Sequence, residues 1–126
     1  MVSELFDVER VEGVTVVRLA GTQFDSEGTV ERLRDELESL IDKQHPRKLL
    51  VSFCRVPHVT SRAFVALLSV REKVHEAGGT MKLCAMHPAI RDAFTVLDLD
   101  AKLVPIHHEE TEALNAFQTH SLETNP

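Results

Sequence analysis

Short apolar runs alternate with longer amphipathic stretches along the whole chain. Two segments rich in β-branched residues, Phe6 to Val11 and Val14 to Leu19, flank a Glu12-Gly13 pair of turn character. This arrangement predicts an antiparallel hairpin. Three later runs are compact and apolar, and each is too short for a helix, so they predict strands at 48–53, 80–86 and 103–107.

Between these runs, apolar residues recur at spacings of three and four, the period of a helix with one buried face. The first such stretch carries Val30, Leu33 and Leu37, and His45-Pro46 ends it because the residue before a proline leaves the α region. The four predicted helices begin near Asp25 or Ser26, near Thr60 or Ser61, at Pro88, and at Glu109 or Glu110.

The resulting order, β-β-α-β-α-β-α-β-α, calls for right-handed crossovers between parallel strands. We therefore predict an α/β fold, with a single-layer, mixed, largely parallel sheet, an N-terminal hairpin and four helices. A chain of 126 residues fits one domain. We assign residues 1–120 to that domain and predict that 121–126 form a frayed C-terminal tail, because they have nothing to bury.

Composition narrows the possible partners and the compartment. With 20 acidic and 14 basic side chains the net charge is −6, which argues against binding to nucleic acid phosphates. The apolar runs stop well short of the about 18 residues that span a bilayer, so we expect no direct membrane insertion. Met1 to Arg10 is too acidic and polar for a secretory signal, and Cys54 and Cys84 are expected to be free thiols. We expect a cytoplasmic protein.

Several kinds of cofactor site find no support in the motifs. The chain has no G-x-G-x-x-G and no G-x-x-x-x-G-K-[ST], so we expect no bound nucleotide cofactor. Cys54-x-x-x-His58 and Cys84-x-x-His87 match no specific zinc signature, and Cys84 lies within an apolar strand. A buried free thiol is therefore favoured there over a metal ligand.

A small hydrolase is a remote alternative. Ser61 or Cys54 would be its nucleophile and His58 its base. No G-x-S-x-G surrounds Ser61, and residues 59–63 contain no glycine for a strained turn. We therefore expect a protein that is not an enzyme.

Thr60-Ser61, at the predicted start of the second helix, admits two interpretations. Serine and threonine are favoured helix caps, worth about 1 kcal/mol over alanine, and the residues alone favour this role. A phosphate at the same place would be held by free backbone N–H groups and the helix dipole. It would add about −1.5 to −2 charges to the surface without unfolding the domain.

The chain from Phe6 to about Phe117 resembles the STAS domain, the fold of bacterial anti-sigma factor antagonists. The stretches that carry the resemblance are VTVVRLAG (14–21), KLLVSF (48–53), VPHVTSRAF (56–64), AGGTMKLC (77–84) and PAIRDAF (88–94), followed by LDL (97–99). In that family the helix after the third strand usually opens with Asp-Ser-Ser-Gly or Asp-Ser-Thr-Gly, and the first serine is phosphorylated by a partner kinase.

The resemblance places Ser61 at the phosphoacceptor position. Thr60, Arg62 and Ala63 depart from the usual acid, hydroxyl residue and glycine, while Asp25 resembles the family's acid before the first long helix. The resemblance thus implies a partner-binding surface on one face of the domain. Its predicted members are Asp25, His58, Thr60, Ser61, Arg62 and Ala63.

The function implied is that of a non-catalytic regulatory binding module, an anti-sigma factor antagonist in bacterial transcription control. Its partner would be an anti-sigma factor and serine kinase of the histidine-kinase-like ATPase type, and phosphorylation of Ser61 would break the complex. ATP would belong to that partner, so this chain needs no cofactor. The alternative within the family is an unphosphorylated scaffold, in a stressosome-like assembly or as a subunit of a lipid-transporting ABC system.

Overall fold

The computed structural model describes residues 5–20, 27–56, 61–88, 92 and 106–124. Its elements are β1 (Phe6–Val11), β2 (Val14–Leu19), α1 (Glu27–Gln44), β3 (Lys48–Ser52), α2 (Ser61–Glu76), β4 (Thr80–Cys84), β5 (Ile106–His107) and α4 (Glu110–Thr124). The strands form one sheet in the order β1-β2-β3-β4-β5. The β1–β2 pair is antiparallel and the other three pairs are parallel, which confirms the predicted mixed sheet with an N-terminal hairpin.

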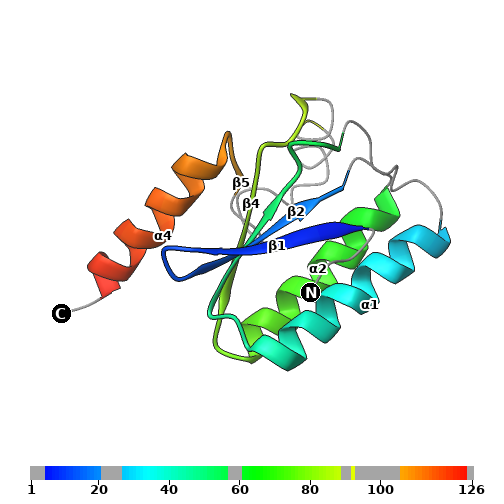
Figure 1. The fold of residues 1–126 in the computed structure, drawn as a ribbon, viewed down its shortest axis with the longest axis horizontal. Helices are drawn as coiled ribbons and strands as arrows, with labels where there is room; N and C mark the ends of the chain where they lie inside the picture. Colours follow the sequence, from blue (N-terminus) through cyan, green and yellow to red (C-terminus); the bar gives the residue numbers. More distant parts are fainter. Residues whose placement is uncertain (1–4, 21–26, 57–60, 89–91, 93–105, 125–126) are drawn as a thin grey trace.

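The helices lie on opposite faces of the sheet, α1 and α2 together on one face and α4 on the other (Figure 1). The main hydrophobic core fills the space between the sheet and the α1–α2 pair. A smaller core lies under α4, built from Val14, Val16, Leu50, Cys84, Ala113 and Phe117. Because both faces are covered, β3 is buried along nearly its whole length, as its apolar run predicts.

Two turns show why the chain reverses where it does. Glu12 and Gly13 both have positive φ, 52° and 82°, the combination that a two-residue hairpin loop requires. At the end of α2, Gly78 has a φ of 86° and Gly79 donates a backbone hydrogen bond to Val74. This is a glycine-based helix end, as the Gly78-Gly79 pair predicts.

Gly79 is also required by its surroundings. A Cβ atom at this position would lie 2.8 Å from the carbonyl oxygen of Pro46 and 2.9 Å from a methyl group of Val74. The backbone of the α2–β4 connection therefore passes too close to its neighbours for any side chain.

The predicted element boundaries agree with the structure to within a few residues. β4 ends at Cys84 because Ala85 has a φ of 59°, outside the extended region. Of the helix predicted from Pro88, only Pro88 and Asp92 are described, and both have helical conformation. The first part of the strand predicted at 103–107 lies outside the described residues. α4 continues to Thr124, so it includes most of the segment 121–126 for which a frayed tail is predicted. That domain boundary stays a prediction.

Within the part of the chain that the structure describes, no helix has the length and apolar character needed to cross a membrane.

Candidate partner-binding site

The six residues predicted for the partner-binding surface are only partly described. Ser61 is the first residue of α2, in agreement with a helix start predicted near Thr60 or Ser61. Asp25, His58 and Thr60 lie outside the described residues. The first turn of α2 carries no acidic side chain. The partial positive charge of this helix end is therefore not offset within its own first turn.

Arg62 is at the surface, whereas Ala63 is not. The Ala63 side chain is only 1% exposed and packs in the main core. It lies four residues before Leu67 and seven before Val70, so it belongs to the buried stripe of α2. The Ala63 side chain is therefore closed to solvent, and a part for this position in partner binding stays a prediction.

The exposed side of α2 carries a hydrophobic residue that the sequence analysis missed. The Val65 side chain is 67% exposed. Among the described residues, it is the one large hydrophobic side chain that is exposed to solvent. It lies outside the buried stripe formed by Leu67 and Val70, and this departure from the helical period is the signal that could have identified it. A single exposed valine is ordinary on a protein surface. Whether Val65 belongs to a binding surface therefore depends on the residues around it.

Val65 stands between two hollows. The first has a volume of about 220 Å³ between α1 and α2 and is lined by Val30, Glu31, Arg34, Arg62, Val65, Ala66 and Ser69. The second, of about 320 Å³, is lined by Val65, Leu68, Ser69, Arg71 and Glu72. We call the two hollows with the Val65 ridge the α1–α2 surface. It combines apolar contact area with side chains of both charges, as protein-binding surfaces do.

Polar contacts hold α1 and α2 together beside this surface. The Ser69 hydroxyl donates a hydrogen bond of 3.1 Å to Glu38, and Lys73 Nζ lies 3.0 Å from Asp42 Oδ1. The hydrogen bond to Asp42 raises the pKa of Lys73, so its ammonium group stays charged at neutral pH. These links bridge the two helices at the surface.

A row of polar side chains crosses the other face of the sheet, beneath the start of α4. Strand register aligns Asp7, Arg18, Ser52, Cys84 and His107 as successive neighbours on β1 to β5. Side chains directly opposite one another in adjacent strands point to the same face. The row therefore has Asp7 and Arg18 at one end, His107 at the other, and buried Ser52 and Cys84 in its middle.

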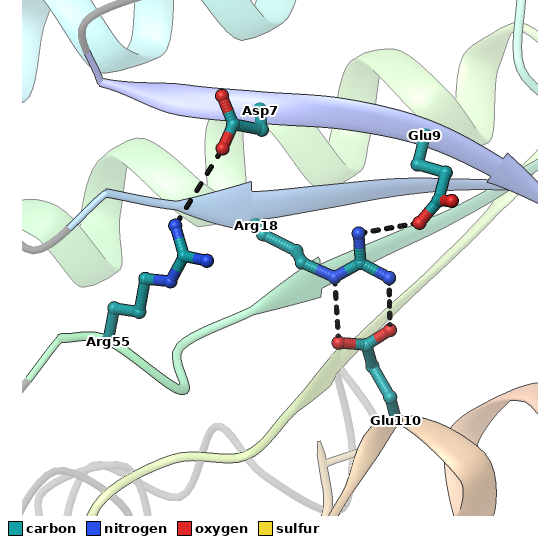
Figure 2. Close-up of polar contacts among 5 residues, drawn as sticks. All are labelled: Asp7, Glu9, Arg18, Arg55 and Glu110. Atoms are coloured by element: carbon teal, nitrogen blue, oxygen red, sulfur yellow. Dashed lines mark hydrogen bonds and ion pairs between the residues drawn. The ribbon is translucent and has the colours of Figure 1, made fainter.

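Arg18 is the centre of the contacts at this face (Figure 2). Its Nε and Nη2 atoms donate hydrogen bonds of 2.9 and 2.8 Å to the two carboxylate oxygens of Glu110. Its Nη1 donates a bond of 2.6 Å to Glu9. The hydrogen bond from Arg18 lowers the pKa of the Glu110 carboxyl group, and the two carboxylates together raise the pKa of Arg18. This cluster ties α4 to the sheet.

The two cysteines are free, as predicted. Cys54 is exposed, and Cys84 is buried in the core under α4. Burial raises the pKa of the Cys84 thiol to about 12, so this thiol is protonated and unreactive at neutral pH. Among the described residues, no group of three or more His, Cys, Asp or Glu side chains could hold a metal ion.

Together these features define a small α/β domain with helices on both faces of its sheet. The STAS domain model matches residues 6–113, and the chain belongs to the STAS domain family. It is 22% identical over 112 residues to BtrV of Bordetella bronchiseptica, whose name assigns it to the anti-sigma factor antagonists. That match covers 89% of this chain and 93% of BtrV.

Solved structures show the same fold. An anti-sigma factor antagonist from Mycobacterium paratuberculosis superposes with a TM-score of 0.77 at 24% identity, covering 90% of this chain and 92% of that one. The phosphorylated form of the Bacillus cell fate determinant SpoIIAA superposes with a TM-score of 0.66 at 20% identity, covering 89% of this chain and 98% of that one.

Proposed function

We propose that this protein is an anti-sigma factor antagonist, a non-catalytic module that acts in the cytoplasm by binding an anti-sigma factor. Membership of the STAS family and the likeness to BtrV support the functional class. The observation that supports the location of the binding site is the exposure of Val65, which lies between two hollows on the first half of α2. We assign the α1–α2 surface to the partner.

The proposed partner is an anti-sigma factor that is also a serine kinase of the histidine-kinase-like ATPase type. Ser61 would be its phosphoacceptor, one helical turn before Val65 on the same helix. A phosphate there would lie at the positive end of α2, close in sequence to Arg62, and would cost the fold little. It would change the charge of the surface by about −1.5 to −2, which is enough to repel an acidic partner surface.

Binding measurements on designed variants test this proposal. Anti-sigma factors of the source organism, purified singly, are titrated against immobilised wild-type protein, Val65→Asp, Ser61→Asp and Thr111→Asp. Thr111 is exposed on α4, so Thr111→Asp adds the same charge on the opposite face as a matched control. We expect Val65→Asp and Ser61→Asp to weaken binding of one anti-sigma factor at least about tenfold, with the control unchanged. Equal affinity of all four proteins would exclude the proposed surface.

The second candidate function is an unphosphorylated STAS scaffold, as in a stressosome-like assembly or a lipid-transporting ABC system. Arg62 and the buried Ala63 favour it, because the segment after Ser61 departs from the family's usual phosphorylated motif. Incubation with the bound kinase and labelled ATP separates the two candidates. Label on the Ser61 peptide supports the switch, and a protein that binds its partner yet stays unlabelled supports the scaffold.

A further inference from the structure

A third hollow lies at the carboxyl ends of the parallel strands, away from the α1–α2 surface. It has a volume of about 480 Å³ and is lined by Phe53, Cys54, Arg55, Val56, Ala85, Met86, His87 and His108. These residues directly follow β3, β4 and β5, and none of them lines the α1–α2 surface. The carboxyl edge of a parallel sheet is where α/β proteins commonly bind ligands, and this volume suits a small molecule. We call it the carboxyl-edge pocket.

The lining of the carboxyl-edge pocket has two chemical parts. Ala85 and Met86 are partly exposed and provide apolar contact area, whereas Phe53 and Val56 line the pocket but are themselves buried in the main core. Arg55 supplies a permanent positive charge, and His87 and His108 supply imidazole rings. None of the described residues that line the pocket is acidic. The complementary ligand therefore has an apolar body and an anionic group.

Backbone hydrogen bonds between neighbouring segments hold the walls of the pocket in place. The amide of Phe53 donates to the carbonyl of Cys84 at 3.0 Å, and the amide of Ala85 donates to the carbonyl of His107 at 3.1 Å. These bonds continue the sheet pairing one step beyond the ends of β3 and β4. Ala85 at the same time adopts a φ of 59°, a conformation that costs free energy for a residue other than glycine. The pocket is thus built on a fixed frame, which reduces the entropic cost of binding.

Arg55 carries the permanent positive charge of the lining. Its guanidinium lies 3.7 Å from the Asp7 carboxylate, beyond hydrogen-bond distance, and both side chains are 60% exposed (Figure 2). So loose and exposed a pair contributes little, and the planar guanidinium can bind an incoming oxyanion with two donors. Asp7 would compete with such a ligand for Arg55.

We propose that the carboxyl-edge pocket binds a small organic anion, with the anionic group on Arg55 and the apolar body against Ala85 and Met86. This site goes beyond the proposed function, because it concerns a small molecule and a different edge of the domain. Loss of anti-sigma factor binding would leave the proposal intact, and loss of anion binding would leave the proposed function intact.

Three probes of related shape test the two parts of the pocket. Phenyl phosphate carries the body and the anion, phenol carries only the body, and inorganic phosphate carries only the anion. Each is titrated into the full-length protein and followed by the amide ¹H–¹⁵N spectrum. We expect phenyl phosphate to shift the amides of 53–56, 85–87 and 108 in a saturable manner, and to bind at least about tenfold more tightly than either fragment. Failure to shift these amides, or equal affinity for inorganic phosphate, would overturn the proposal.

Variants of opposite expected sign provide the decisive comparison. Arg55→Gln should weaken phenyl phosphate binding by about tenfold or more, whereas Asp7→Asn should strengthen it by about twofold to fivefold. Arg10→Gln removes an exposed arginine on β1 as the matched control and should change nothing. The unperturbed remainder of each spectrum verifies the fold. If Arg55→Gln and Arg10→Gln bind equally well, or if Asp7→Asn weakens binding, Arg55 does not hold the anion.

Discussion

The bidentate contact between Arg18 and Glu110 leads to a quantitative prediction about α4. Both side chains are 27% exposed, so the pair is neither fully solvated nor fully buried. Among the described side chains of α4, Ala113 and Phe117 are buried in the smaller core and Leu114 packs against it, so the contact with Arg18 is a large part of what holds the first turn of the helix. We therefore expect Glu110→Gln to lower the free energy of unfolding measurably without abolishing folding.

The magnitude follows from what the substitution removes. A hydrogen bond to a charged group contributes about 1.5–3 kcal/mol, and an acidic residue in the first helical turn contributes about 0.3–1 kcal/mol. Glutamine keeps one oxygen that can accept from Arg18, and partial exposure screens the lost charge. We expect Glu110→Gln to cost about 1–2 kcal/mol, and a double-mutant cycle with Arg18→Gln to give a coupling energy of about 1–1.5 kcal/mol.

Urea unfolding monitored by circular dichroism at 222 nm measures these values, because the chain has no Trp or Tyr for fluorescence. Glu109→Gln changes the adjacent exposed carboxylate and serves as the matched control. The pH dependence supplies a second test. Because Arg18 lowers the pKa of Glu110 in the folded state, its stabilisation is complete above the unfolded pKa of about 4.3 and is lost as the pH falls through the lower folded value.

The difference in stability between wild type and Glu110→Gln should therefore be constant at neutral pH and shrink below about pH 4. A coupling energy below about 0.3 kcal/mol would show that the Arg18–Glu110 pair contributes no more to stability than an ordinary exposed ion pair. A difference independent of pH would show that the charge of Glu110 is not what anchors α4. Either result would refute the role assigned to the cluster.

Two further predictions concern single positions. Gly79→Ala should lower the free energy of unfolding by about 1–3 kcal/mol in the same urea assay, because its Cβ would lie 2.8 Å from the Pro46 carbonyl oxygen. Gly28→Ala, whose Cβ would meet nothing within 4 Å, should be neutral or stabilising by up to about 1 kcal/mol, and equal losses would contradict the steric argument. Iodoacetamide at neutral pH should label Cys54 in the folded protein and reach Cys84 only after unfolding, as mass spectrometry of the peptides would show. Labelling of native Cys84 at the rate of Cys54 would disprove its burial.

Much of the fold could be predicted from the sequence because the elements have their own periods. Alternating and continuous apolar runs indicated the hairpin, β3 and β4, and a stripe with spacings of three and four indicated α1 and its buried face. Gly78-Gly79 marked the end of α2 for a local reason, a backbone conformation that favours glycine. Such features depend on residues that are close together in the chain, so they can be predicted from the sequence alone.

The candidate site could be predicted only in part. The sequence placed Ser61 at the start of a helix through local capping preferences, and the structure agrees. It did not distinguish Ala63 from Val65, two small apolar residues on one helix. Their exposures are 1% and 67%, because Ala63 lies on the buried stripe with Leu67 and Val70 and Val65 lies off it, a difference that the helical period carries.

The remaining features were decided by tertiary structure. Arg18 and Glu110 lie 92 positions apart, and their contact depends on how α4 packs against its face of the sheet. The carboxyl-edge pocket likewise requires the parallel alignment of β3, β4 and β5, which brings Arg55, His87 and His108 to one edge. Local periodicity determines which residues are buried in each element, whereas strand register and helix placement determine which distant charges meet.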